Sequence, residues 1–384
     1  MFKKLFIIIL SFFTFGEVIR LDFGGGVALK PIDIAVGLTT IIWLIFRLVR
    51  KEKIKQKQIY IPVLFFAGSG AMSLLINYSS LTVGQFFAAL MYLVRWIAYA
   101  GIFFVVSDFD KDFKKTISKR LIFVGSLIVG LGYLQYFFYN SLRNLFYLGW
   151  DEHMYRMFSV FLDPNFAGAF FVLFFLFLIN KFLKDRNIPI GILSFLTLGA
   201  IFLTFSRSAL IMLVVSTILL FALLNKKIWI TALVATVFLS IAISSRYFNI
   251  ENINLFRVIS SEARLQTARK AIGIIGDHPV FGVGFNAYRY AKLNGNLGGS
   301  NLNTVSHADA GTDNSFLFVI ATTGVIGFIL YLFLWLNILK AVSPLAIASI
   351  IGVFVDSMFI NSLFYSFIML WLWIILALSM KSNN

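Results

Sequence analysis

Two arginines in this sequence have the chemistry and the placement to bind one anion together. Arg207 lies in the turn Thr204-Phe205-Ser206-Arg207-Ser208 between two apolar segments, and Arg264 lies in the long hydrophilic segment that follows. A guanidinium group presents a planar fork of donors that grips phosphate or carboxylate in a bidentate manner. We therefore predict that Arg207 and Arg264 converge on an anion at a membrane surface. The alternative is that Arg207 is an interfacial anchor at a helix end.

The histidines are candidates for proton transfer, because imidazole titrates near neutral pH and can remove a proton from a hydroxyl group. His307 precedes Asp309 and Asp313 in a polar stretch, so a histidine–carboxylate pair is predicted there. His153 and His278 are more typical of surface or packing histidines. The three show no metal-binding spacing such as H-E-x-x-H, and we predict no metal site.

The segment Asp163-Pro164-Asn165 opens an apolar stretch after a short polar one that contains Arg156. An Asp before a Pro is typical of a helix start, where the carboxylate caps the first turn. Asn165 and Arg156 would then face the same surface as Arg207.

The elements that must position these residues are membrane helices. Of the 384 residues, 60% are hydrophobic and 13% are charged, whereas a soluble domain has about 25% charged residues. No globule of this size could cover so much apolar surface with polar groups. The chain has no Cys, which excludes disulfides, zinc–thiolate sites and thiol catalysis.

Apolar segments long enough to cross a bilayer recur along the whole chain. We expect twelve spans, at about 5–19, 32–49, 59–78, 84–106, 121–139, 160–180, 188–205, 208–224, 228–245, 314–337, 343–360 and 362–380. Arg95 and Asp356 fall inside spans, where they could pair with each other or contact a lipid headgroup.

Lysine and arginine are distributed unequally between the two sides of the membrane in the predicted topology. One side of the twelve-span topology carries 16 Lys and 4 Arg, and the other carries 9 Arg and 3 Lys. The positive-inside rule makes the lysine-rich side cytoplasmic, together with both termini. The net charge of +16 would suggest nucleic acid in a soluble protein, but here it reflects membrane topology, and no nucleic acid partner is predicted. We expect a multi-pass protein of the cytoplasmic membrane, with its arginine-rich face and active site outside.

A single integral membrane domain, residues 1–384, is expected to carry one large extracytoplasmic loop, residues 246–313, between spans nine and ten. Within the loop, apolar residues recur at helical spacing, at Leu265, Ala268, Ile272 and Ile275. This pattern predicts an amphipathic helix over 261–275 that lies against the membrane.

The rest of the loop predicts a turn and a flap. In Asp277-His278-Pro279-Val280-Phe281-Gly282-Val283-Gly284, the two final glycines are expected to let the backbone approach another group closely. Residues 293–312 are rich in Gly, Asn, Ser and Thr and are predicted to form a mobile flap.

In their order, spacing and common side, these motifs resemble the O-antigen ligase and O-antigen polymerase superfamily. The similarity runs across most of the predicted spans five to twelve. It rests on Arg156-Met157-Phe158-Ser159 before Pro164-Asn165, Thr204-Phe205-Ser206-Arg207, Arg264 in the outer helix, His278-Pro279-Val280-Phe281-Gly282-Val283-Gly284, and Asp313-Asn314-Ser315-Phe316-Leu317 before Thr323-Gly324-Val325-Ile326-Gly327.

The resemblance implies an all-α polytopic membrane protein of the GT-C type with about twelve transmembrane helices. It implies a membrane glycosyltransferase, metal-independent and without a cofactor, that takes a glycan from an undecaprenyl-pyrophosphate carrier at the outer face of the inner membrane. A ligase passes the glycan to a lipid or protein acceptor, and a polymerase passes it to another carrier-linked glycan. Either activity serves the synthesis of surface polysaccharide, such as lipopolysaccharide, in the cell envelope.

The resemblance also implies roles for individual residues. Arg207 and Arg264 match the family arginines expected to hold the pyrophosphate. Ligases have a His-Asn pair just before a late span, and this sequence has Asp313-Asn314 there, so the base is either Asp313 or His307. The expected substrate-binding residues are Arg156, Asn165, His278, Arg289 and Asn314.

Because Asp313 stands where ligases have a histidine, a polymerase activity stays possible beside a ligase activity. A third reading, a flippase or other transporter of lipid-linked glycans, would predict internal repeats and charges near the bilayer midplane. Only Arg95 and Asp356 fit that pattern, and no repeat is evident. A non-catalytic scaffold would leave the outer arginines unexplained.

Overall fold

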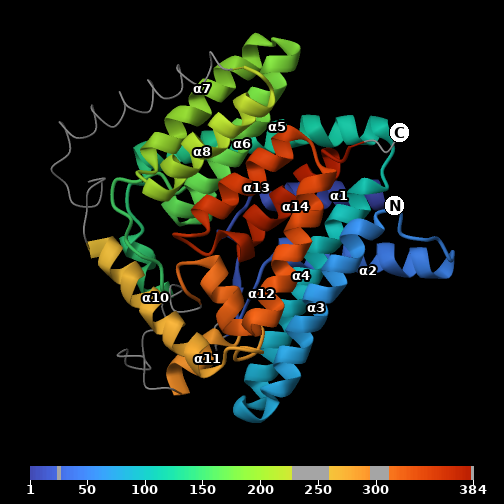
Figure 1. Ribbon diagram of the computed structural model, residues 1–384. Coiled ribbons are helices and arrows are strands. Elements are labelled where there is room, and N and C mark those ends of the chain that lie inside the picture. The colour runs from blue at the N-terminus through green and yellow to red at the C-terminus, as the bar shows by residue number, and fades with distance from the viewer. Residues whose placement is uncertain (24–26, 227–258, 295–310, 382–384) are drawn as a thin grey trace.

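The computed structural model describes residues 1–23, 27–226, 259–294 and 311–381, and these are mostly helical (Figure 1). The first half contains α1 (Phe2–Phe13), α2 (Pro31–Val49), α3 (Lys57–Ile76), α4 (Val83–Ser107), α5 (Lys111–Phe138), α6 (Pro164–Asp185), α7 (Ile188–Leu203) and α8 (Arg207–Leu223). The second half contains α10 (Ile259–Asp277), α11 (Tyr288–Asn294), α12 (Ser315–Ala341), α13 (Pro344–Asp356) and α14 (Ser366–Leu378). A hairpin of β1 (Leu21–Asp22) and β2 (Ala28–Leu29) follows α1.

Eleven of the twelve predicted spans correspond to described helices, and the span predicted at 228–245 lies outside the described residues. Six helices are long and apolar enough to cross a bilayer, namely α2, α3, α4, α5, α6 and α12. Four more, α7, α8, α13 and α14, are apolar but shorter. The multi-pass, all-helical membrane class is confirmed, whereas the number twelve and the GT-C type stay predictions.

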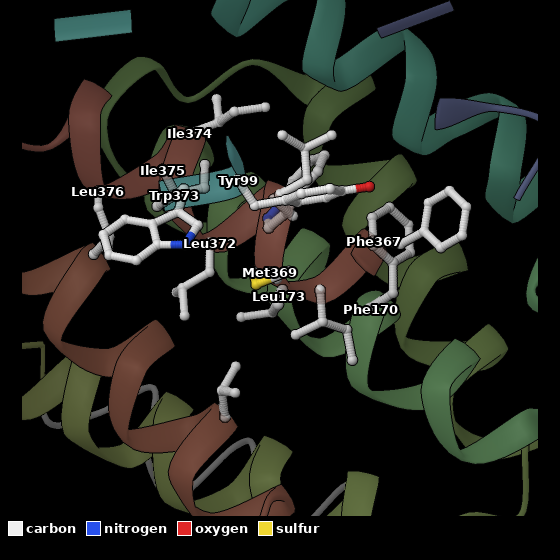
Figure 2. Packing of buried hydrophobic residues seen from close by; sticks show 14 of the residues in the cluster. Tyr99, Phe170, Leu173, Phe367, Met369, Leu372, Trp373, Ile374, Ile375 and Leu376 are labelled. Atoms are coloured by element: carbon white, nitrogen blue, oxygen red, sulfur yellow. The ribbon is translucent and has the colours of Figure 1, made fainter. Parts of the chain in front are cut away.

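Helix α14 lies at the centre of the bundle. Each of its residues from Ser366 to Ala377 is buried, because neighbouring helices surround it. Figure 2 shows its side chains, among them Phe367, Met369 and Trp373, beside Tyr99 and Phe170. A helix that is apolar on every side is stable only when it is enclosed. In contrast, α2 exposes Leu38, Ile41 and Ile45 on its outer face, as expected of a helix that faces lipid.

The loops gather at two ends of the bundle. At the lysine-rich end, Lys3 pairs with Asp110, Arg47 pairs with Asp108, and Val342 forms a β-bridge with Met380. The N and C labels lie at this end in Figure 1, far from α10 and α11. The predicted grouping of the lysine-bearing loops with both termini therefore agrees with the arrangement of the helices.

The amphipathic segment predicted at 261–275 is helical and forms most of α10. Its inner face packs through Ala271 and Ile274 in a small cluster with Tyr288 and Phe318. Leu265 and Ile272, from the predicted apolar stripe, are exposed on the outer face. That exposure fits a helix lying against a membrane, which stays a prediction.

The glycine-rich turn after α10 docks into a break in α12. Gly324 leaves helical geometry there with φ 67°, and the Val325 amide donates to the Pro279 carbonyl at 2.9 Å. A Cβ on Gly324 would lie 2.1 Å from the Val280 oxygen. On the other side, a Cβ on Gly282 would lie 2.5 Å from the Thr322 carbonyl carbon. The predicted close approach of backbone is thus confirmed, and the group approached is α12.

We predict that Gly324→Ala destabilises the protein, because Ala would clash with the Val280 carbonyl and would hold a left-handed φ. The strained backbone alone costs on the order of 1–3 kcal/mol. Thermal unfolding in detergent measures the loss as a lowered Tm.

The matched control is Gly130→Ala in α5, where a Cβ meets nothing within 4 Å. It should leave Tm unchanged or raise it slightly, since Ala favours a helix over Gly by about 1 kcal/mol. Equal Tm values for the two variants would show that the docked turn does not constrain α12.

Candidate functional site

A cavity of about 360 Å³ opens at the end of the bundle opposite the lysine-rich end. Its walls come from the loop after α1, the outer parts of α4, residues 149–166, α10, residues 285–289, residues 311–318 and residues 360–369. Residues from nearly every part of the chain therefore meet in one hollow, which is where a polar site in an apolar bundle is expected.

Arg264 and Asp313 line this cavity together. Arg264 lies on α10 and Asp313 lies just before α12, and the two helices pack against each other. The Thr267 hydroxyl, one turn after Arg264, donates to Asp313 Oδ2 at 3.2 Å. Burial raises the pKa of Asp313 above its ordinary value, while Arg264 and the Thr267 hydrogen bond pull it down. Asp313 is thus a partly buried carboxyl group held beside a cation.

Arg207 is the first residue of α8, and the turn before it is fixed by buried hydrogen bonds. Arg156 is buried and donates from Nε to the Thr204 carbonyl at 2.9 Å and from Nη2 to the Phe205 carbonyl at 3.4 Å. Ser206 caps α8 by accepting from the Ala209 amide. Phe205 holds a left-handed φ of 49°, a conformation that needs such support.

Asn165 contacts the residues that fix this turn and also lines the cavity. Its Oδ1 accepts from Ser206 Oγ at 3.1 Å and from Arg156 Nη2 at 3.3 Å, and the residue also lines the cavity. Two of the predicted substrate-binding residues, Arg156 and Asn165, therefore position the turn that carries Arg207.

Arg207 and Arg264 lie close enough to interact electrostatically, and like charges repel. Arg264 lines the cavity, whereas Arg207 is not among the lining residues. The N-terminus of α8, with the positive end of its helix dipole, lies at the same place. An anion bound between the two guanidinium groups would relieve their repulsion.

Arg289 adds a third guanidinium group to the cavity wall. It lies on α11, and its buried Nε has no hydrogen-bond partner. The neighbouring Tyr288 packs inward, and burial together with the charge of Asp313 raises its pKa to about 12. Tyr288 is therefore neutral at physiological pH.

The other predicted site residues lie as follows. Asn314 caps α12, accepting from the Phe316 and Leu317 amides at 2.9 and 3.0 Å. His278 is exposed in the docked turn and is not part of the cavity lining. His307 lies outside the described residues. Asp163 caps α6, as its sequence context predicts, and it also lines the cavity.

The suggested pairing of Arg95 with Asp356 is wrong. Arg95 donates to Asp33 Oδ2 at 2.6 Å and to the Ala28 carbonyl at 2.7 Å, and it lines the cavity. Asp356 is fully buried and accepts from the Ser362 hydroxyl. Arg95, in the middle of α4, pairs with a residue in the first turn of α2, whereas Asp356, at the end of α13, binds a hydroxyl group six residues later.

Sequence reasoning missed one whole wall of the cavity. Glu17, Arg20 and Lys30, from the loop after α1, line it together with Trp150 and Tyr365. The available signal was weak, because it consists of single charges in short loops without a motif. Three charged residues, Arg20, Asp22 and Lys30, within a predicted outer loop of twelve residues were the one feature that could have indicated it.

Residues 192–332 match the family model described as O-antigen ligase. The predicted resemblance to the O-antigen ligase superfamily is thereby confirmed over this part of the chain, which contains Arg207, Arg264, Arg289 and Asp313. No curated protein matches the chain. The wall that contains Glu17 and Lys30 lies outside the matched residues.

We predict that Arg156→Lys destabilises the protein by about 1–3 kcal/mol, the cost of leaving buried carbonyl groups without donors. A lysine ammonium has no planar fork and does not reach Thr204, Phe205 and Asn165 together. The measurement is Tm in detergent. Arg143→Lys, at an exposed position, is the control and should stay within about 0.5 kcal/mol of the parent. If Arg156→Lys matched this control, the support of the Arg207 turn would not depend on the guanidinium group.

Proposed function

We propose that this chain, as a member of the O-antigen ligase superfamily, transfers a glycan from an undecaprenyl-pyrophosphate carrier to an acceptor in surface polysaccharide synthesis. The family match supports transfer of a lipid-linked glycan. The observation that carries the proposal is the meeting of Arg264 and Asp313 in one cavity, with Arg207 within electrostatic reach of Arg264. The lysine-rich end lies opposite the cavity, which supports an active site on the outer face of the cytoplasmic membrane.

In this proposal Arg207 and Arg264 act on the leaving group. When the bond between the sugar C1 and the pyrophosphate oxygen breaks, its electron pair stays with the prenyl pyrophosphate and negative charge develops there. Two fixed guanidinium groups stabilise that charge without reorganising. The apolar side chains of the surrounding bundle offer the prenyl chain an environment like lipid.

Asp313 acts as the general base. The acceptor hydroxyl oxygen forms the new bond to C1, and its proton passes to the Asp313 carboxylate. A carboxyl group whose pKa burial has raised is a stronger base than an exposed one. Arg264 favours the ionised form of the Asp313 carboxyl group before the reaction, which is the form that accepts the proton.

A ligase and a polymerase differ in the acceptor substrate that receives the glycan. We favour a ligase-like transfer to a lipid or protein, with the polymerase as the alternative, in which the acceptor is a second carrier-linked glycan. Both use the same leaving group, so the roles proposed for Arg207, Arg264 and Asp313 hold for either.

We predict that Arg264→Ala and Arg207→Ala each lower the transfer rate by about 10²–10³, the usual effect of removing one donor that stabilises developing charge. The assay follows glycan transfer from a prenyl-pyrophosphate-linked donor by the purified protein in lipid. Arg269→Ala is the control, because Arg269 lies on the same helix but is exposed and outside the cavity lining. Full activity of Arg264→Ala would refute the proposed role.

We also predict that the fall of the transfer rate at acidic pH, the acidic limb of the pH–rate profile, depends on Asp313. Because burial raises its pKa, the carboxylate is protonated, and the rate falls, at a higher pH than an ordinary Asp would require. Thr267→Val removes a hydrogen bond that lowers this pKa. The limb should therefore shift to higher pH in this variant, with the plateau rate retained.

The control for this shift is Thr267→Ser, which keeps the hydroxyl group and should keep the limb in place. A limb that stays fixed in Thr267→Val, or moves to lower pH, would contradict the assignment of Asp313 as the base.

A further inference from the structure

The cavity has a second wall whose charges are already paired. Lys30 pairs with Glu17, Arg20 lies 2.9 Å from Asp22, and Arg95 lies 2.6 Å from Asp33. We call Glu17, Arg20, Lys30 and Arg95 the ion-paired wall. Its cations are neutralised by carboxylates, so they offer little attraction to a further anion.

Arg264 and Arg289, which we call the arginine side, line the same cavity and differ in this respect. None of the ion pairs found among the described residues involves Arg264 or Arg289. The lining of one cavity thus contains two kinds of charged group: guanidinium groups outside any ion pair of the described residues, and cations already neutralised by carboxylates.

The ion-paired wall presents an acceptor and a hydroxyl group whose hydrogen bonding is incomplete. Glu17 is buried and its Oε1 accepts from Lys30 Nζ, while its Oε2 lies 3.7 Å from Arg20 Nη1 and has no close hydrogen-bond donor. The Tyr365 hydroxyl lies beside the Glu17 carboxylate and interacts with it, without a well-formed hydrogen bond. A buried polar atom whose hydrogen bonding is incomplete is costly, and the cavity is where a further partner can enter.

The position of the Glu17 carboxylate is fixed from several directions. The Glu17 amide donates to the Val160 carbonyl at 2.8 Å. Lys30 Nζ lies over the rings of Tyr365 and Phe367, at 5.4 and 5.0 Å from their centroids. A carboxylate held this firmly is a preorganised acceptor for hydroxyl groups.

Aromatic rings flank these groups. Tyr365 stacks on Phe166 with ring centroids 3.9 Å apart, and Arg20 lies over the Trp150 ring at 5.7 Å. Trp150, Phe166 and Tyr365 all line the cavity. Rings supply flat apolar surface for the C–H face of a sugar, and the carboxylate accepts from its hydroxyl groups.

We propose that the ion-paired wall, with Tyr365, is the acceptor site, and that it binds an uncharged sugar through its hydroxyl groups. This inference rests on the proposed function, because it assigns the second substrate of the same transfer. The carrier pyrophosphate then occupies the arginine side, and the acceptor hydroxyl comes between the two, within the cavity that Asp313 also lines.

The test measures binding without turnover. The full-length protein in lipid nanodiscs, free of sugar-headed detergent, is titrated by calorimetry with a panel of methyl glycosides of neutral hexoses and N-acetylhexosamines. The methyl glycoside of glucuronic acid is the charged comparison, and inorganic pyrophosphate probes the arginine side. We expect saturable binding of at least one neutral glycoside and weaker binding of the glucuronide.

Two variants report on the wall. Glu17→Gln should weaken neutral glycoside binding roughly tenfold, the effect of losing a hydrogen bond to a charged acceptor. Tyr365→Phe should weaken it by about three- to tenfold and should change Tm little, because the ring stays stacked on Phe166 and the hydroxyl makes no well-formed hydrogen bond. This second variant keeps the test valid if Glu17→Gln disturbs folding through Lys30.

Binding of pyrophosphate distinguishes a failure of this inference from a failure of the proposed function. Tyr365→Phe should bind pyrophosphate like the parent, and Arg264→Ala should lose pyrophosphate while still binding the glycoside. If no neutral glycoside binds, or if Tyr365→Phe binds it unchanged, the acceptor site is refuted while the arginine site stands. If pyrophosphate fails to bind the parent protein, the proposed function itself is refuted.

Discussion

The mutual repulsion of Arg207 and Arg264 is the constraint on which the rest of this site depends. Two guanidinium groups near a membrane surface separate unless the backbone holds them. Here each is carried by a helix whose start or neighbourhood is fixed by buried contacts. The structure therefore holds two like charges within electrostatic reach of each other, an arrangement that suits the binding of an anion.

Two separate devices hold the arginines. The turn before Arg207 is fixed by Arg156 and Asn165, whose polar atoms bind its carbonyl groups and its capping serine. Arg264 depends on α10, which is anchored where the turn after it docks into the break at Gly324. The two devices use different parts of the chain, one before α8 and one between α10 and the break within α12.

The helices and the two arginines could be predicted from sequence, because long apolar segments and isolated Arg residues are local signals. The positions of the short helices α13 and α14 could be predicted, but their burial could not, since burial depends on neighbours that are distant in sequence. The predicted Arg95–Asp356 pairing was wrong because Arg95 instead pairs with Asp33, 62 residues away in the sequence, a contact that no local pattern indicates. The wall of Glu17 and Lys30 was missed because the two residues pair with each other across thirteen positions of the sequence, and neither belongs to a recognisable motif.

The most direct test of the central claim is a double-mutant cycle for binding of a short prenyl pyrophosphate, with Arg207→Ala, Arg264→Ala and the double variant. If both groups hold one diphosphate, their effects on the free energy of binding are coupled, by about 0.5–3 kcal/mol. Effects that add within about 0.3–0.5 kcal/mol would mean that the two arginines act independently, and the account of a shared anion would be contradicted.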